Sequence, residues 1–306
     1  MVNQPIRQHT VPKVYLKRFP LVEDRLFEFR PEEARWFGVS AANASVRKHA
    51  YTYNEQDGTR SYVVEESLSK LESMADAALK RLDELGPSGL QGQERLIIAN
   101  FIAVQHYRTN KMKEVADTAE SMLRTATVQE RLLDESLPEI IDDYSEAEIA
   151  EYRQSIRDGT AKFGEGQFFV RHFMGNVSKP VRDYVFNMDW RTERIVASSH
   201  GYFITSDTPF AVRRRGKLID DRIVPLRETD SEFYFPVSNR TMLIGSNDGG
   251  RDRKLKSQLR IDELNKIILA NCHQSIYSPL EDERLAMLHA TLDGFKIPAP
   301  VPFIEK

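Results

Sequence analysis

The segment FITSDTPF, residues 203–210, ends in a hydroxyl and a carboxylate. Apolar and β-branched residues lead into Ser206 and Asp207, and Pro209 then prevents further strand pairing, so we expect a strand that ends here. Asp207 could cap the backbone of a turn, which is a common role for aspartate at such a position. It could instead orient an imidazole, bind a cation or pair with an arginine.

An amide and a guanidinium occur among large apolar residues in the segment 92–123, whose periodicity predicts one long helix. Gln105 and Arg108 share a helix face with Phe101 and Met112, because the four are spaced 4, 3 and 4 apart. Burying either polar group without a partner would be costly. Arg108 could therefore pair with an internal carboxylate, or this face could be a pocket wall that binds an anionic ligand with two parallel hydrogen bonds.

Two carboxylates and a histidine could complete such a site. Glu65 and Glu72 lie two turns apart on the helix predicted at 64–85, roughly 10 Å along its axis, where they could bracket a ligand, pair with Arg108 or face solvent. His9 precedes the segment TVPKVYLKRF, and histidine titrates near neutrality, which suits a general base; a structural or surface role is the alternative. Tyr15 in that segment is expected to anchor the core.

Two basic segments could contact phosphate groups. RRRGK at 213–217 is typical of a hairpin turn, and RDRKLKSQLR at 251–260 leads into the last predicted helix, at 261–274. Runs of charge are more often solvated surface than binding sites. The sequence has no glycine-rich phosphate-binding loop that would favour a nucleotide site.

The composition excludes several classes of protein. The chain has 306 residues, 41% of them hydrophobic and 29% charged, so it can bury a substantial core without a metal or a disulfide. Its one cysteine excludes a disulfide framework, and its net charge of −3 gives no overall attraction to nucleic acid. Without an apolar leader or a membrane-spanning run in the sequence, we expect a cytoplasmic protein that does not enter the membrane.

The order of the predicted elements indicates an α+β fold. Extended segments occupy residues 1–64 and 189–280, including the strand RLFEFR at 25–30 and a hairpin around Asp57 and Gly58, while helical periodicity dominates residues 65–188. We therefore predict a single domain over residues 1–306. Its mixed or antiparallel sheet would be built from N- and C-terminal strands, with a block of long helices inserted between them.

The chain resembles a mainly bacterial family of unknown function, DUF4238. Five segments occur in the family's order: HTVPKVYLKRF, FIAVQHYRTNKMKE, FITSDTPF, FYFPVS and LNKIILANCHQSIYS. The resemblance extends from His9 to about Tyr277. Its matching positions are His9, Pro12, Tyr15, Phe19, Glu65, Glu72, Gln105, Arg108, Ser206, Asp207, Pro209 and Pro236. The family often has asparagine where this chain has Thr208, and it carries no settled activity, so the resemblance implies a fold and a set of residues.

These residues support a hypothesis with two alternatives. The leading hypothesis is a metal-dependent phosphodiester hydrolase, such as a nuclease, with Mg²⁺ or Mn²⁺ held by Glu72 and Asp207. His9 would be the general base or a metal ligand, Arg108 would stabilise negative charge and Gln105 would orient water or substrate. Glu65, Ser206 and Tyr15 are secondary candidates. The main alternative is a non-catalytic interaction or sensor module with a buried polar network, and a third is a binder of a small anionic ligand.

Overall fold

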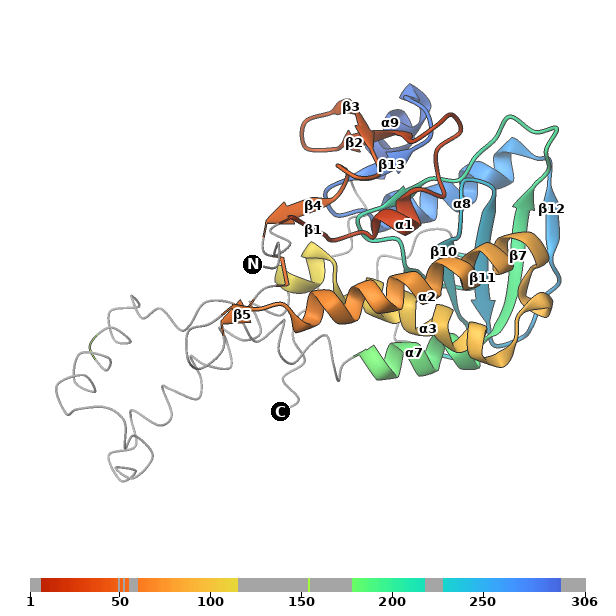
Figure 1. Cartoon of the computed structure of the whole chain (residues 1–306). Coiled ribbons are helices and arrows are strands. Elements are labelled where there is room, and N and C mark those ends of the chain that lie inside the picture. Colours follow the sequence, from red (N-terminus) through yellow and green to blue (C-terminus); the bar gives the residue numbers. More distant parts are fainter. Residues whose placement is uncertain are drawn as a thin grey trace.

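The computed structural model describes residues 7–48, 50–51, 53–54, 60–114, 154, 178–217 and 228–292. Within the helical block predicted at 65–188, residues 115–177 lie outside the described residues, apart from Gln154. The α+β class is confirmed: helices alternate with mostly antiparallel sheets (Figure 1). The single domain over the whole chain stays a prediction.

One sheet combines strands from both ends of the chain, as predicted. Its neighbours all pair antiparallel, with Phe29 opposite Ile276 and Ile276 opposite Ser206. Its strands, in spatial order, are β3 (Arg35–Ser40), β2 (Arg25–Arg30), β13 (Ile276–Ser278) and β8 (Thr205–Ser206).

A second, larger sheet is formed entirely by later strands, so the described strands do not form the one common sheet that was predicted. Its strands, in spatial order, are β12 (Arg253–Leu255), β7 (Asp189–Ile195), β11 (Thr241–Ser246), β10 (Ser231–Pro236) and β9 (Ala211–Arg214). Only β12 pairs parallel, with β7. Every residue of β10 and β11 is buried, which requires cover on both faces of this sheet.

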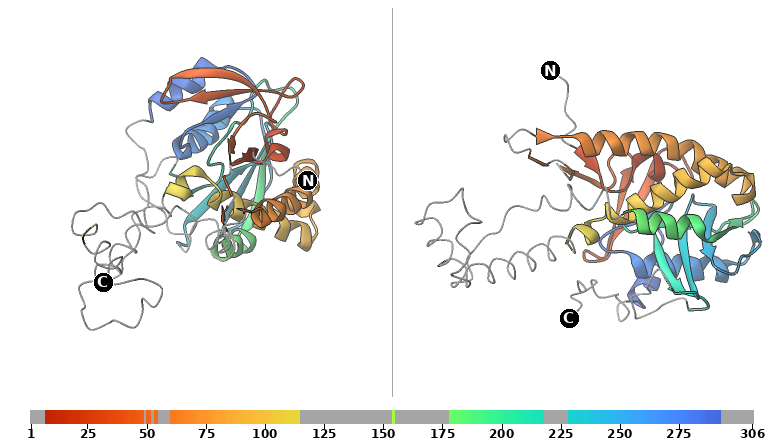
Figure 2. Two further views of the ribbon diagram at one scale, coloured as in Figure 1. Left: turned by 60° about the vertical axis from the view of Figure 1, so that its left-hand side comes forward. Right: turned by 90° about the horizontal axis from the view of Figure 1, so that it is seen from below.

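Helices supply that cover from both sides. Phe233, Phe235 and Leu243 pack in one core with α2 (Val63–Leu85), α3 (Gly92–Tyr107) and α7 (Ser178–Asn187). The alternating residues Tyr234, Met242 and Ile244 belong to a second core with α8 (Gln258–Asn271) and α9 (Glu283–Ala290). The right panel of Figure 2 shows the sheet between these helical layers. No described helix combines the length and apolarity needed to cross a membrane.

Small elements near the N-terminus complete the frame. Strand β1 pairs antiparallel with β4, so that His9 lies opposite Val46. Tyr53 pairs with Ser61 in the predicted hairpin, whose turn around Asp57 lies outside the described residues. The bounds of these elements are β1 (Arg7–His9), α1 (Lys13–Leu16), β4 (Val46–Lys48), β5 (Tyr53–Asn54), β6 (Arg60–Ser61) and η1 (Pro87–Gly89).

The helix predicted over 92–123 is interrupted, which corrects the prediction. Helix α3 ends at Tyr107, Arg108 is its C-terminal cap, and residues 110–114 are helical again. Thr109 explains the break, because its hydroxyl donates to the carbonyl of His106 and accepts from the amide of Met112 at 3.3 Å. A threonine that accepts from an amide three residues later is a typical N-cap. Arg108 therefore lies at a helix end, from which it reaches several elements.

Candidate functional site

Arg108 is buried, with 3% of the residue exposed, and has partners on α2, on β1 and in the turn before β5. Its Nη1 lies 2.7 Å from Glu72 Oε1 on α2, and its Nη2 donates to the carbonyl of His9 on β1. The hydroxyl of Tyr51 donates to the carbonyl of Arg108 at 3.0 Å and accepts from its Nε at 3.4 Å. Of the alternatives open at the sequence level, the internal carboxylate partner is the one observed.

Gln105 lies on the same helix face as Arg108 and binds Thr10, the residue that follows His9 in the chain. Its Nε2 donates to the carbonyl of Thr10 at 3.1 Å, while Oε1 has no hydrogen-bond partner among the described residues. Gln105 is fully buried. Gln105 and Arg108 therefore hold the consecutive carbonyls of Thr10 and His9 and fix the end of β1 against α3.

Glu65 and His9 border the same network. Burial raises the pKa of Glu65, the nearby charge of Arg108 opposes this and that of Glu72 adds to it. Its buried Oε2 accepts no hydrogen bond from the part of the chain that the structure describes. Burial also lowers the pKa of His9, whose Nε2 lies 3.2 Å from the carbonyl of Ala42 and so acts as the donor there. This contact ties β1 to the loop before β4.

Tyr15 and Ser206 are structural residues of the core. The hydroxyl of Tyr15 donates to the carbonyl of Pro236 at 2.7 Å and contacts Thr205 Oγ1 at 2.9 Å, and burial strongly raises its pKa. Ser206 is fully buried, and its hydroxyl accepts from the amide of Thr208 at 3.2 Å. Neither of these two secondary candidates lines a described pocket.

Asp207 caps a distant turn of the backbone. Its Oδ1 accepts from the amide of His273 at 3.0 Å, and its Oδ2 accepts from the amide of Gln274 at 2.8 Å. Burial raises the pKa of this carboxyl, whereas the two amides act in the opposite direction. Asp207 therefore caps backbone amides, but these follow α8, far along the chain, and do not belong to the local turn that the sequence suggested, where the amide of Thr208 donates to Ser206 Oγ.

The structure thus brings together five of the predicted residues, namely His9, Glu65, Glu72, Gln105 and Arg108. Asp207 belongs to a separate hydrogen-bond network, so the proposed joint cation site of Glu72 and Asp207 has no observed geometry. Across the described ranges, no group of three or more His, Cys, Asp or Glu residues could hold a metal ion. The phosphodiester hydrolase stays a prediction, which a nuclease assay with Mg²⁺ or Mn²⁺ on the wild type and Asp207→Asn would test.

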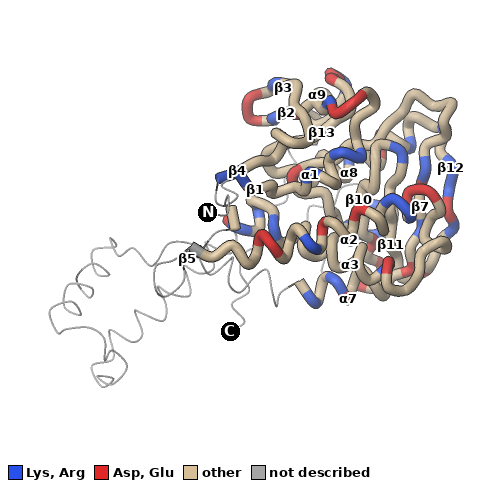
Figure 3. Tube along the Cα trace, viewed as in Figure 1, with Lys and Arg blue, Asp and Glu red and all other residues tan. Residues whose placement is uncertain are grey.

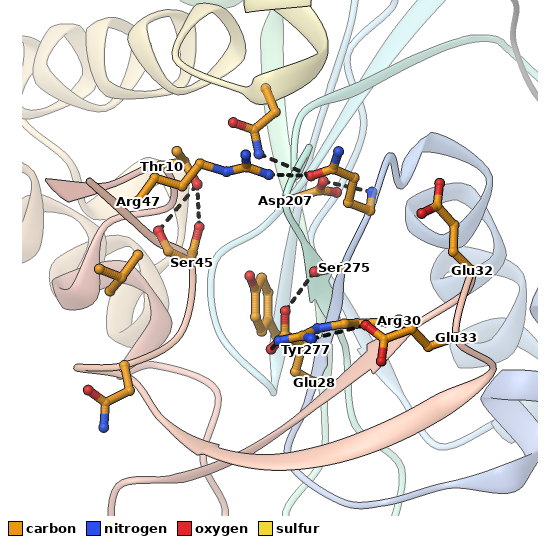
Figure 4. Close-up of a pocket in the computed structure, with 14 residues that line it drawn as sticks. Thr10, Glu28, Arg30, Glu32, Glu33, Ser45, Arg47, Asp207, Ser275 and Tyr277 are labelled. Carbon is orange, nitrogen blue, oxygen red and sulfur yellow. Dashed lines mark hydrogen bonds and ion pairs between the residues drawn. The ribbon is translucent and has the colours of Figure 1, made fainter. Parts of the chain in front are cut away.

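A polar pocket of about 460 Å³ lies between the two networks. It is bordered by β1, β4, the end of β8, and the paired strands β2 and β13 (Figure 4). Its lining residues are Thr10, Glu28, Arg30, Glu32, Glu33, Asn43, Ser45, Val46, Arg47, Asn110, Asp207, Gln274, Ser275 and Tyr277. Of the predicted site residues, only Asp207 is among them.

One wall of this pocket is acidic. Glu28 is 7% exposed and accepts from Ser275 Oγ at 2.7 Å and from Arg30 Nη2 at 3.2 Å. Arg30 also donates to Glu33 at 3.0 Å, whereas Glu32 is exposed. This wall therefore carries three carboxylates and a single guanidinium. Beside it, burial strongly raises the pKa of Tyr277, and the charges of Glu28 and Asp207 act in the same direction.

The opposite wall carries the hydrogen-bond donors Arg47 and Asn110, and beside them lies the carboxylate of Asp207, which accepts from the amides of His273 and Gln274 (Figure 4). Arg47 is exposed, and its Nη2 donates to Gln274 Oε1 at 2.6 Å. Asn110 donates to the same oxygen at 3.3 Å. Within the described ranges, no carboxylate lies within 4 Å of the Arg47 guanidinium. Figure 4 shows Arg47 and Glu28 on different sides of the pocket, with Tyr277 beside Glu28.

Comparison with models of known protein families shows to which family this chain belongs. A family model described as "Protein of unknown function (DUF4238)" matches residues 7–282. The chain belongs to the DUF4238 family. No curated protein and no solved structure matches it. The DUF4238 match includes the Arg108 network and every residue that lines the pocket.

Most of the pocket in this DUF4238 chain was missed at the sequence level. A signal existed for Glu28, which lies two residues after buried Leu26 in RLFEFR and therefore shares its inward face. Arg47 gives no comparable signal, because it lies in a three-residue strand and contacts a residue late in the chain.

Proposed function

We propose that this pocket binds a small zwitterionic metabolite with an amino group and a carboxylate, such as a free amino acid. The observation that carries the proposal is the separation of charge across the pocket. Arg47 lies on one wall without a carboxylate partner in the described ranges, and the other wall carries Glu28, Glu32 and Glu33 against a single Arg30.

Each wall suits one end of such a ligand. The guanidinium of Arg47, with the amide of Asn110 beside it, offers charged and neutral donors to a carboxylate. The acidic wall has a formal charge of −2 from its three carboxylates and one guanidinium, which favours an ammonium group. A purely anionic ligand, the third alternative from the sequence, would face the three carboxylates of the acidic wall, where Arg30 is already paired with Glu28 and Glu33.

The size and polarity of the pocket fit a metabolite. A volume of about 460 Å³ falls within the range of roughly 300–1,000 Å³ that is typical of small-molecule sites. The hydroxyls of Thr10, Ser45 and Ser275 and the amides of Asn43 and Gln274 add donors and acceptors. These groups favour a ligand that forms hydrogen bonds over one that is mainly apolar.

The residues first predicted to be catalytic position this pocket. Gln105 and Arg108 hold the carbonyls of Thr10 and His9, and the amide of Thr10 donates to the carbonyl of Ser45 at 2.9 Å. The buried network therefore sets the place of Thr10 and Ser45 on the pocket wall. This role agrees with the predicted alternative of a buried polar network.

A thermal-shift screen of the full chain against the common amino acids tests the proposal. We expect at least one amino acid to raise the melting temperature, because a ligand that binds only the folded state stabilises it. Its deaminated and decarboxylated analogues should each have a smaller effect at the same concentration. If simple carboxylates or phosphates stabilise the protein as well as every amino acid does, the proposal is wrong.

A further inference from the structure

A strip of positive charge follows the outer edge of the five-stranded sheet, at the opposite end of the molecule from β1 and β4 (Figure 1). Its residues, called here the basic strip, are Arg251, Arg253, Lys254 and Lys256, and all four are exposed. No carboxylate lies within 4 Å of their charged groups in the described part of the chain. Figure 3 shows the trace in blue along β12, where this strip lies.

The acidic residues nearest to the basic strip, in sequence or in strand register, form hydrogen bonds or ion pairs with residues outside the strip. Asp252 interrupts the strip, but its Oδ1 accepts from the amide of Thr192 at 2.6 Å and from the Thr192 hydroxyl at 2.9 Å. Glu193, opposite Arg253 on β7, is fully buried and lies 2.8 Å from Arg260 Nη2. Opposite Lys254 lies Arg194, another cation. The outward charge of this edge is therefore strongly positive, although the chain as a whole is acidic.

We infer that the basic strip binds the phosphodiester backbone of nucleic acid without reading its sequence. The five steps from Arg251 to Lys256 span roughly 16 Å at about 3.3 Å per extended residue. A DNA duplex carries one phosphate charge about every 1.7 Å of helix axis when both strands are counted, so a strip of this length meets a dense row of negative charge. A linear array of unpaired cations fits this repeating charge better than it fits a compact anion. The inference is independent of the pocket and of the ligand proposed for it.

The test is fluorescence anisotropy of a labelled 20-base-pair DNA duplex titrated with the full chain at several salt concentrations. Four phosphate contacts predict a slope of log K against log salt of about −3.6, so binding should weaken by about 150-fold between 50 and 200 mM salt. The variant Arg251→Gln, Arg253→Gln, Lys254→Gln, Lys256→Gln should lose nearly all binding at 50 mM salt. Circular dichroism should show that its fold and melting temperature are unchanged.

A matched control variant distinguishes the effect of the basic strip on DNA binding from the effect of the net charge of the protein. The variant Lys17→Gln, Lys70→Gln, Lys80→Gln, Lys179→Gln also removes four positive charges, all from exposed lysines outside the strip, and should bind the duplex within about 2-fold of the wild type. Equal loss in the two variants would overturn the inference, as would no binding by the wild type at 50 mM salt. Binding of polyglutamate as tight as that of the duplex would also overturn it, because the partner would then be an acidic polypeptide.

Discussion

The guanidinium of Arg108 and the carboxylate of Glu72 form an ion pair at 2.7 Å, in which the arginine side chain is 2% exposed and the glutamate 19%. The pair joins the end of α3 to α2, and the second terminal nitrogen of Arg108 extends it to the carbonyl of His9. Three elements that are distant in sequence therefore meet at one charged group. Both partners were candidates for chemistry at the sequence level, and in the structure they neutralise each other.

Arg108→Ala should therefore be strongly destabilising. It leaves the carboxylate of Glu72 and the carbonyl of His9 without their donor in a buried place, and breaking one side of a buried pair costs about 3–5 kcal/mol. Urea denaturation followed by circular dichroism measures this loss. Arg182→Ala is the control, because the Arg182–Asp183 pair is 31% and 57% exposed and should contribute only about 0–1 kcal/mol. Similar losses in the two variants would contradict the assigned role of Arg108.

Tyr15→Phe should lower stability without affecting the pocket. The change removes a donor from the carbonyl of Pro236 and a partner from Thr205, both in the core, so we expect a loss of about 1–3 kcal/mol in the free energy of unfolding. The stabilisation by a ligand found in the amino-acid screen should stay the same as in the wild type. A variant of normal stability that no longer responds to the ligand would show that Tyr15 acts at the site.

Asp207→Asn should loosen the turn after α8. An asparagine can accept a hydrogen bond only through its oxygen, so one of the amides of His273 and Gln274 would face an NH₂ group. We expect about 1–3 kcal/mol lower stability by chemical denaturation. Because Gln274 also accepts from Arg47, ligand affinity should fall with it. Unchanged stability would indicate that Asp207 does not cap this turn.

His106 should make folding sensitive to acid. Burial, together with the nearby charge of Lys111, lowers its pKa to about 4, and its ring packs edge-on against Phe210 with centroids 5.3 Å apart. The folded state therefore holds a neutral imidazole, whereas the unfolded chain binds a proton below about pH 6.5. The contribution of the neutral His106 to the free energy of unfolding is therefore complete above about pH 6.5. It is lost as the pH falls toward 4, by at most about 1.4 kcal/mol per pH unit.

His106→Phe keeps an aromatic ring against Phe210 and removes the titration. The difference in unfolding free energy between wild type and variant, measured by urea denaturation at several pH values, should be constant above pH 6.5. Below it, the wild type should lose stability relative to the variant. A difference that does not change between pH 7 and pH 4 would rule out His106 as the source of acid sensitivity.

The sequence predicted those parts of the fold whose pattern is local. The helix predicted at 64–85 and the strand RLFEFR predicted at 25–30 are present as α2 and β2. The network around Arg108 was also predictable, because a guanidinium and an amide on an apolar helix face require partners. The two carboxylates on α2 supplied the first candidates.

The remaining features depend on contacts that leave no local pattern. The partners of Asp207 are backbone amides at residues 273 and 274, and a backbone amide looks the same at every position of a sequence. The helix break arises from a single cap, Thr109, within an otherwise helical stretch. Arg47 and Glu28 meet in one pocket only because β1, β4, β2 and β13 assemble from both ends of the chain.

We propose that the two walls of the pocket bind opposite charges of one ligand. The variants Arg47→Gln and Glu28→Gln remove one charge from each wall, and Arg182→Gln and Glu66→Gln are controls at positions that do not line the pocket. Each variant's melting temperature without ligand verifies that it is folded.

Isothermal titration calorimetry of these variants is the most direct test, using the amino acid from the screen with its deaminated and decarboxylated analogues. Arg47→Gln should weaken the amino acid and the deaminated acid at least about 10-fold and leave the amine unchanged, since a charge-assisted hydrogen bond is worth about 1.5–3 kcal/mol. Glu28→Gln should weaken the amino acid and the amine but leave the acid unchanged. If both variants bind all three compounds as the wild type does, the ligand does not occupy this pocket between its two charged walls.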